Sequence, residues 1–182
     1  MRRMRPRGDF GGVAIATAAL QNVLRRSWPF FQAAQATELN ALLAQSLVEI
    51  PLPLGSTPIV VGDINSSPDD GPFPNPVTGP FLPPYTQFAS GFDLFGAPTG
   101  IGAQTDAWDL RPGKDPGFTC CELSDLSNPT TLDDERIDVI FSVQVPSKVK
   151  ANVIGNQPSD KTRPSRLWPS DHAGVVGTLT FP

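Results

Sequence analysis

The chain has 182 residues, enough for one domain with its own hydrophobic core. Hydrophobic residues make up 39% and charged residues 18%, which argues against a largely disordered chain. The net charge is −4, and because residues 1–9 hold four arginines and one aspartate, the remaining chain carries −7. This acidic balance disfavours, without excluding, binding to duplex nucleic acid. No apolar run approaches the ~20 residues that a transmembrane helix needs.

Residues 1–31 differ from the rest of the chain. A basic start precedes the short apolar run 13–20, which is the polarity of a signal peptide. Gly8 and Asp9 interrupt this pattern, so export by this segment is not favoured. We predict an atypical segment over residues 1–31, disordered or misassigned, and a domain over residues 32–182. A cytoplasmic and a secreted location both stay open.

A helix is predicted over residues 32–50, because apolar side chains recur there at spacings of three and four: Leu39, Leu42, Leu43, Leu47 and Ile50. The prolines that follow end it. A short strand at 59–61 then leads into Gly62-Asp63. A helix followed by a buried strand is typical of a layered α/β fold.

The second half of the chain contains mainly predicted strands. Residues 66–87 are rich in Pro, Gly and Ser, which predicts a long irregular loop. Short helical turns are expected at 88–94 and 106–110. Runs of β-branched and aromatic residues predict four strands, at 118–121, 136–143, 149–154 and 174–181.

Asp63 and Asn65 directly follow a predicted buried strand, where α/β sheets collect ligand-binding residues. The Asn65 amide can donate to a phosphoryl oxygen, and Asp63 can accept a proton from an attacking water. The alternative is an Asx turn that only ends the strand.

Asp138 begins a strongly apolar strand and therefore needs a partner for its carboxylate. Two partners are available, Arg136 on the same strand and His172, which is the only histidine in the chain. An Asp–His pair would fix the imidazole tautomer and favour its cation beside a phosphate. Ser170-Asp171 directly precede this histidine.

Cys120 and Cys121 are adjacent in the sequence. Neighbouring side chains on a strand point to opposite faces, so one thiol is expected to be buried and the other exposed. A vicinal disulfide is the alternative in an oxidising compartment. Two cysteines and one histidine do not make a structural zinc site. A zinc or thiol enzyme stays a minor alternative that would require sensitivity to thiol reagents.

Five motifs occur in a fixed order: Gly-Asp-Ile-Asn at 62–65, Asp-Ala-Trp at 106–108, Gly-Phe-Thr at 117–119, Arg-Ile-Asp at 136–138 and Ser-Asp-His at 170–172. This order resembles the endonuclease/exonuclease/phosphatase superfamily of metal-dependent phosphoesterases, in particular a bacterial branch. The resemblance covers residues 32–182. It implies a four-layer α/β sandwich, of which this chain would contain mainly the second half.

The resemblance also implies roles for individual residues. Asp63 would position or deprotonate the attacking water, and Asn65 would steady the phosphate. Asp138 would pair with His172, which would bind the scissile phosphate, and Asp171 would lie at the metal. Supporting residues would be Asp106, Thr119 and Arg136. The implied reaction is hydrolysis of a phosphate ester with Mg²⁺ or Mn²⁺ as cofactor. Trp108 is expected to be a core residue.

The chain departs from the family in its first half. That half normally supplies the principal metal-binding glutamate and another histidine, and this chain has only one histidine. Glu38 and Glu49 lie on the predicted helix and are expected to be solvated charges. The alternative to an enzyme is therefore an inactive truncated remnant, or a module that binds a partner or itself through an uncovered sheet. The acidic body favours a small phosphoester over duplex DNA.

Overall fold

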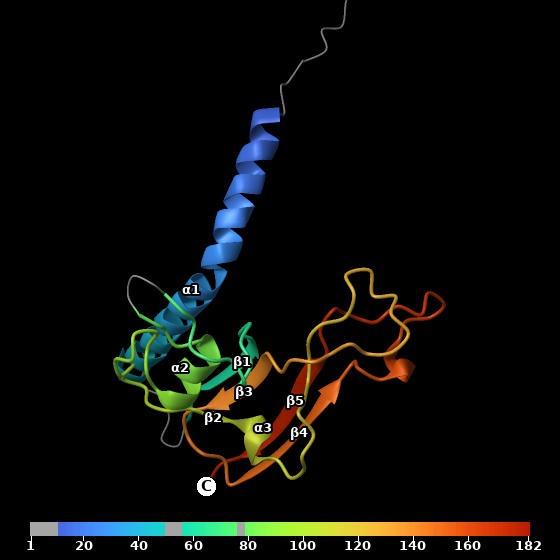
Figure 1. Ribbon diagram of the computed structural model, residues 1–182. Helices are drawn as coiled ribbons and strands as arrows, with labels where there is room; N and C mark the ends of the chain where they lie inside the picture. The colour runs from blue at the N-terminus through green and yellow to red at the C-terminus, as the bar shows by residue number, and fades with distance from the viewer. Residues whose placement is uncertain (1–10, 50–55, 76–78) are drawn as a thin grey trace, which may run out of the picture.

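A computed structural model describes residues 11–49, 56–75 and 79–182. In chain order its elements are helix α1 (Gly11–Glu49), strand β1 (Ile59–Asp63), helix α2 (Pro84–Ser90), strand β2 (Thr105–Asp106), helix α3 (Ala107–Leu110), strands β3 (Asp138–Ser142) and β4 (Lys148–Ile154), a 3-10 turn (Pro158–Asp160) and strand β5 (Gly174–Thr180) (Figure 1). None of the helices described is long and apolar enough to cross a membrane.

The strands form two small antiparallel sheets, one with the order β1-β3-β2 and one of β4 and β5. The register between β1 and β3 places Asp63 directly opposite Asp138. The predicted mixed α/β class is therefore confirmed, with two small sheets. The full four-layer sandwich stays a prediction.

Strand β3 is the centre of the fold because its two faces pack on different clusters. Val139 and Phe141 face a core that includes Tyr85 and Phe88 of α2, with Phe141 fully buried. Ile140 faces the other way, toward a cluster from α3, β4 and β5 that includes Trp108. Trp108 is thus a buried core residue, as the sequence predicts. A strand that is packed on both faces holds its first residue, Asp138, in a fixed position.

Helix α1 begins at Gly11, well before residue 32, where the leucine pattern places its start. It includes the apolar run 13–20 and Pro29. Part of the segment expected to be disordered, residues 11–31, is therefore helical, whereas residues 1–10 lie outside the described residues. The domain boundary after residue 31 stays a prediction.

The leucines that predict the helix do not form the buried face of α1. Leu42 is 53% exposed, and Leu39 and Leu47 are exposed as well. The buried face carries small and polar residues instead, namely Ala33, Ala36 and Asn40. They allow close approach to α2 and its neighbours, where Gln87 Nε2 donates to the carbonyl of Ala33 at 2.9 Å and Gln104 Nε2 donates to Asn40 Oδ1 at 2.7 Å. Hydrogen bonds therefore decide which face is buried, and a hydropathy pattern does not register them.

Two other predicted elements change their limits. Helix α2 begins at Pro84, earlier than predicted, because proline is favoured in the first turn of a helix. It ends at Gly91, whose left-handed φ of 75° lets its N–H donate to the Gln87 carbonyl. The strand predicted at 118–121 is reduced to two isolated bridges at Cys120, one to Glu135 and one to His172. Backbone hydrogen bonds join this segment to both neighbours, but it is too short to form a named strand.

Loops 118–135 and 155–173 form a lobe beyond the ends of β4 and β5, and we call it the loop lobe (Figure 1). Polar contacts hold it together. The buried Glu122 carboxylate accepts from Asn128 Nδ2 and, at 3.0 Å, from the N–H of Leu132. The Asn128 carbonyl accepts from Lys161 Nζ and, at 3.0 Å, from the indole N–H of Trp168. Both loops of the lobe are thus tied to one asparagine.

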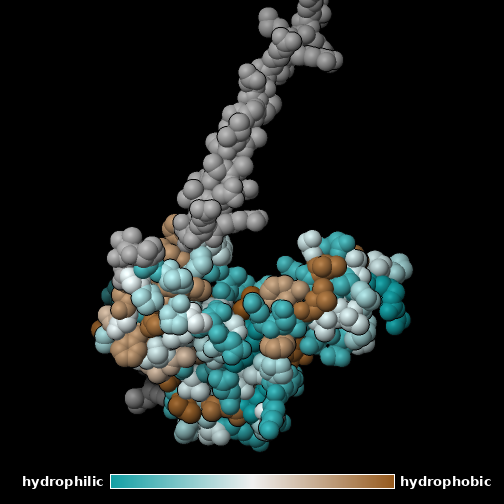
Figure 2. Space-filling model, in the orientation of Figure 1, coloured by the Kyte–Doolittle hydropathy of each residue, from teal (hydrophilic) through white to brown (hydrophobic). Residues whose placement is uncertain are grey.

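Apolar side chains are exposed on strands β1 and β5, one in each sheet. Val61 is 67% exposed and Val176 49%. A groove of about 440 Å³ lies beside them, lined by residues 61–62, 138–140 and 175–177. Hydrophobic residues are otherwise scattered among hydrophilic ones on the face shown in Figure 2.

Candidate active site

Asp63 and Asn65 form an Asx turn at the end of β1. The N–H of Asn65 donates to Asp63 Oδ1 at 2.7 Å, and its side-chain amide donates to Asp63 Oδ2 at 3.1 Å. Asn65 has a left-handed φ of 49°, a conformation that asparagine tolerates better than most residues. The Asx turn given as the alternative in the sequence analysis is therefore present. Both side chains are nevertheless exposed, and each has further donor or acceptor positions that a ligand could use.

Asp138 pairs with His172 and not with Arg136. His172 Nδ1 lies 3.0 Å from Asp138 Oδ2, and both side chains are partly buried. Asp138 and His172 are 34 residues apart in the sequence, and their contact joins strand β3 to the loop lobe. Since a carboxylate accepts hydrogen bonds, this contact places the proton on Nδ1 and leaves Nε2 available to another partner.

The charges around His172 favour its cation. Partial burial alone would lower the pKa of His172, but the hydrogen bond to Asp138 and the negative charges of Asp138, Asp63 and Asp171 outweigh burial and raise it. Three carboxylates from three segments therefore act on one imidazole. The result is a positive group surrounded by acids, an arrangement suited to a phosphate accompanied by a cation.

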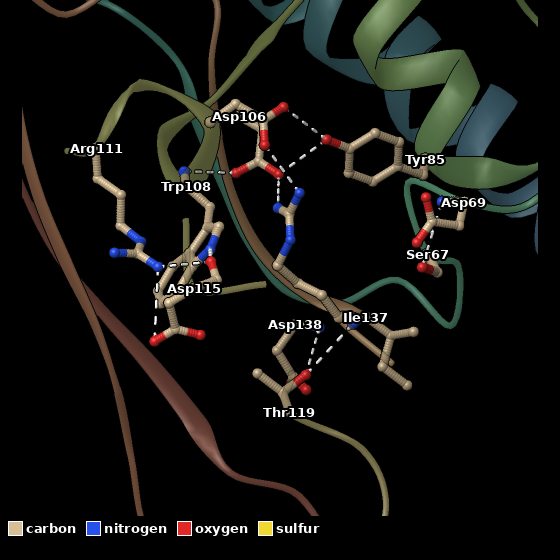
Figure 3. Close-up of polar contacts among 12 residues, drawn as sticks. Ser67, Asp69, Tyr85, Asp106, Trp108, Arg111, Asp115, Thr119, Ile137 and Asp138 are labelled. Carbon is tan, nitrogen blue, oxygen red and sulfur yellow. Dashed lines mark hydrogen bonds and ion pairs between the residues drawn. The ribbon is translucent and has the colours of Figure 1, made fainter. Parts of the chain in front are cut away.

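Thr119 holds the start of β3 in place (Figure 3). This residue is fully buried, and its hydroxyl oxygen accepts from the N–H of Asp138 at 3.2 Å and of Ile137 at 3.3 Å. The N–H of Thr119 donates to the Glu135 carbonyl at 2.8 Å. Thr119 thus orients the backbone on which the Asp138 carboxylate sits, without a contact to the carboxylate itself.

Arg136 belongs to a separate buried network, whose members Tyr85, Asp106 and Trp108 are labelled in Figure 3. It pairs with Asp106 and, at 2.9 Å, with Asp109. The Asp106 carboxylate also accepts from the Tyr85 hydroxyl at 3.0 Å and from the N–H of Trp108 at 2.9 Å. Burial, followed by the charge of Asp106, raises the pKa of Tyr85, so this hydroxyl stays protonated and donates. The network links α2 and α3 to the start of β3.

Asp171 lies exposed beside His172 at the edge of the loop lobe. Its Oδ1 accepts from the Ser170 hydroxyl at 3.2 Å, and its carbonyl accepts from the N–H of Glu122 at 2.8 Å. The backbone of Asp171 is therefore fixed, while its carboxylate faces solvent. This is the position of an acid that can still bind a ligand.

A hollow of about 160 Å³ is lined by Asp63 and Asn65 together with residues of α1 and α2. Some of the lining side chains are apolar, among them Trp28, Leu39 and Phe88. The turn that carries Asp63 therefore also borders a partly apolar hollow. No signal in the sequence placed α1 beside this turn.

Sequence reasoning missed three residues around these groups. Tyr85 donates to Asp106, and its place after Pro83-Pro84 gave no hint of this. Cys121 Sγ lies 3.9 Å from His172 Nε2. Burial raises the pKa of Asp133, and the charge of His172 acts against that rise. Each contact joins segments far apart in the chain, so only the fold reveals it.

Two solved structures of TDP2 from Caenorhabditis elegans match this chain. The chain resembles TDP2. A truncated form is 18% identical, with 83% of this chain and 48% of that chain covered and a TM-score of 0.49. A selenomethionine form is 17% identical, with 83% and 37% covered and the same TM-score of 0.49. The chain thus spans less than half the length of these proteins.

No family model matches the chain, and no curated protein matches it.

Proposed function

We propose that this chain hydrolyses phosphate esters by attack of water, with a divalent cation as cofactor. The observation that carries the proposal is the Asp138–His172 pair, with Nδ1 and Oδ2 3.0 Å apart, beside the exposed Asp63–Asn65 turn. A paired imidazole, an exposed acid and an amide donor are the groups that phosphoryl transfer to water uses.

Each group has a distinct task in the proposed reaction. Asp138 keeps the proton of His172 on Nδ1 and stabilises the imidazolium, so that Nε2–H donates to a phosphoryl oxygen. Asp63 accepts the proton of the attacking water. Asn65 holds the Asp63 carboxylate in place through its backbone N–H and side-chain amide, 2.7 and 3.1 Å away. The second N–H of that amide can donate to the phosphate.

The available oxygen donors fit a magnesium-type cation that is completed by substrate. Asp171 would hold the ion, and Asp63 is a second exposed carboxylate whose charge acts on the same imidazole. Mg²⁺ commonly uses only one or two protein carboxylates and takes its remaining ligands from water and phosphate. When bound, the cation would neutralise charge that develops on the phosphoryl oxygens. Two carboxylates predict weak binding in the absence of substrate.

The test is hydrolysis of a chromogenic phosphodiester by the whole chain with Mg²⁺ or Mn²⁺ and then with EDTA. We expect the chelator to abolish hydrolysis, and His172→Ala and Asp63→Asn each to lower it by at least ~100-fold. Asp69→Asn is the matched control, an exposed carboxylate six residues along the same loop, and it should leave the rate unchanged. A soluble, folded chain without metal-dependent turnover would overturn the proposal.

A second candidate is a module that binds a second copy of this chain. The exposed Val61 and Val176, which lie beside the groove of about 440 Å³, favour it. Self-association should then rise with concentration in analytical ultracentrifugation and disappear in Val61→Asp. A monomer at every concentration would count against this candidate.

A further inference from the structure

The two cysteines and the single histidine are brought together by the backbone. Cys120 forms β-bridges with both Glu135 and His172. On either side of the second bridge, the N–H of Glu122 donates to the Asp171 carbonyl and the N–H of Ala173 to the Thr119 carbonyl, each at 2.8 Å. Segments 119–122 and 171–173 therefore lie antiparallel in a fixed register, which holds His172 against the cysteines.

The side chains place three metal-binding atoms within reach of one ion. Both Sγ atoms and a nitrogen of His172 lie within 4.8 Å of one another, and Cys121 Sγ is 3.9 Å from Nε2. Asp138 occupies Nδ1, so Nε2 is the nitrogen with a free lone pair when the ring is neutral. Cys120 is buried and Cys121 is exposed, which leaves one side of the group open to solvent.

Their chemistry differs from that of the proposed magnesium site. Two thiolates and an imidazole are soft or borderline ligands, which prefer Zn²⁺ and related ions to Mg²⁺. Two cysteines and one histidine with one open position is a known zinc arrangement.

We propose that Cys120, Cys121 and His172 Nε2 form a binding site for a thiophilic divalent cation of the Zn²⁺ type, open only when the two cysteines are reduced. In the structure the two sulfurs are joined by a disulfide. A thiol reductant breaks this bond: each sulfur gains one electron and one proton, and two reductant thiols are oxidised to a disulfide. Binding of the ion then releases the two thiol protons.

This site shares Nε2 with the proposed phosphate contact. An ion bound to Nε2 takes up the lone pair, so Nε2 no longer carries a proton to donate to phosphate. Zinc binding would therefore inhibit phosphoester hydrolysis, and only in the reduced chain. The inhibition rests on the proposed function, whereas the binding of the metal does not.

The test measures binding directly. Zn²⁺ is titrated calorimetrically into the whole chain, once reduced and once with the disulfide intact, and Co²⁺ is used as a spectroscopic probe. We expect one equivalent of Zn²⁺ in the reduced chain, with a sulfur-to-cobalt charge-transfer band, and no such binding in the oxidised chain. Cys121→Ser and His172→Ala should each weaken binding by at least ~10-fold. Ser124→Ala, an exposed control in the same lobe, should not.

Three outcomes would overturn the site: equal binding by oxidised and reduced chains, unchanged affinity in Cys121→Ser, or no Zn²⁺ bound by a reduced chain that circular dichroism shows to be folded. Cys121 is the residue to change because it is exposed, whereas a change at the buried Cys120 could unfold the lobe.

The activity assay separates the two proposals. If the chain binds Zn²⁺ but does not hydrolyse the phosphodiester, only the proposed enzyme activity is contradicted. If the chain hydrolyses the phosphodiester but does not bind Zn²⁺, only the proposed metal site is contradicted.

Discussion

The Asp138–His172 pair joins two regions that are held together by different forces. Asp138 begins β3, whose residues Val139 and Phe141 pack into an aromatic core with Tyr85 and Phe88. Ring centroids in this core lie 5.2 Å apart for Tyr85–Phe141 and 5.4 Å for Phe88–Phe141. Burial of apolar area stabilises this region and is not sensitive to the loss of one polar contact.

The loop lobe around His172 has no comparable apolar core. Its two loops meet at Asn128, whose carbonyl binds Lys161 and Trp168 and whose amide binds Glu122. In a buried polar network, removal of one member leaves its partners buried without a hydrogen bond, which is costly. The acid of the pair should thus be robust, and the imidazole should depend on a few hydrogen bonds.

The largest expected effect is on the aromatic core. Phe141→Ala removes a fully buried ring between Tyr85 and Phe88 and should lower the free energy of unfolding by ~3–5 kcal/mol. Chemical denaturation followed by circular dichroism measures it. Phe95→Ala is the matched control, since this ring is 60% exposed and its loss should change stability by less than ~0.5 kcal/mol. Equal losses in the two variants would contradict a core centred on β3.

A smaller and more local effect is expected in the loop lobe. Asn128→Ala deprives the buried Glu122 carboxylate of one donor and should cost ~1–3 kcal/mol. Hydrogen exchange should show lost protection in segments 119–122 and 171–173, with β1 and β3 unchanged. Asn152→Ala, at an exposed position of β4, serves as control. If β3 lost protection to the same extent, the two regions would be one cooperative unit.

A single hydroxyl of the aromatic region should matter less. Tyr85→Phe keeps the ring but removes the donor to Asp106 at 3.0 Å. The carboxylate retains Arg136 and the N–H of Trp108, so a loss of only ~0.5–1.5 kcal/mol is expected in thermal or chemical unfolding. A loss above ~3 kcal/mol would mean that Asp106 depends on Tyr85 more than on its other partners.

The smallest effect links the two regions through pH. Because the pKa of His172 is raised above its ordinary 6.5, the Asp138 contact contributes stability that is fully present below about pH 6.5. That contribution is lost as the pH rises through the folded-state pKa, where the imidazole loses its charge. NMR titration of the single histidine should give a midpoint above 6.5, and Asp138→Asn should lower it. An unchanged midpoint in Asp138→Asn would show that Asp138 and His172 do not interact in solution.

Local patterns were enough to find the elements that carry the acids. The β-branched runs at 59–61, 136–143 and 174–181 correspond to β1, β3 and β5, because β-branched residues favour extended backbone even where, as in β1 and β5, they are not buried. The leucine spacing found α1 but placed its start too late, at residue 32. Its buried face is chosen by hydrogen bonds to Gln87 and Gln104, which are 50 or more residues away in the sequence from the helix residues they bind.

The sequence by itself determined which residues could do chemistry and in what order they occur: Asp63 and Asn65 after one strand, Asp138 at the start of another, and Asp171 and His172 before the last. The tertiary structure alone decided the partners. In the folded chain Asp138 pairs with His172, Arg136 pairs with Asp106, and Cys121 lies close to the same imidazole. Propensity and spacing act over a few residues, whereas these pairings depend on where strands and loops distant in the chain meet.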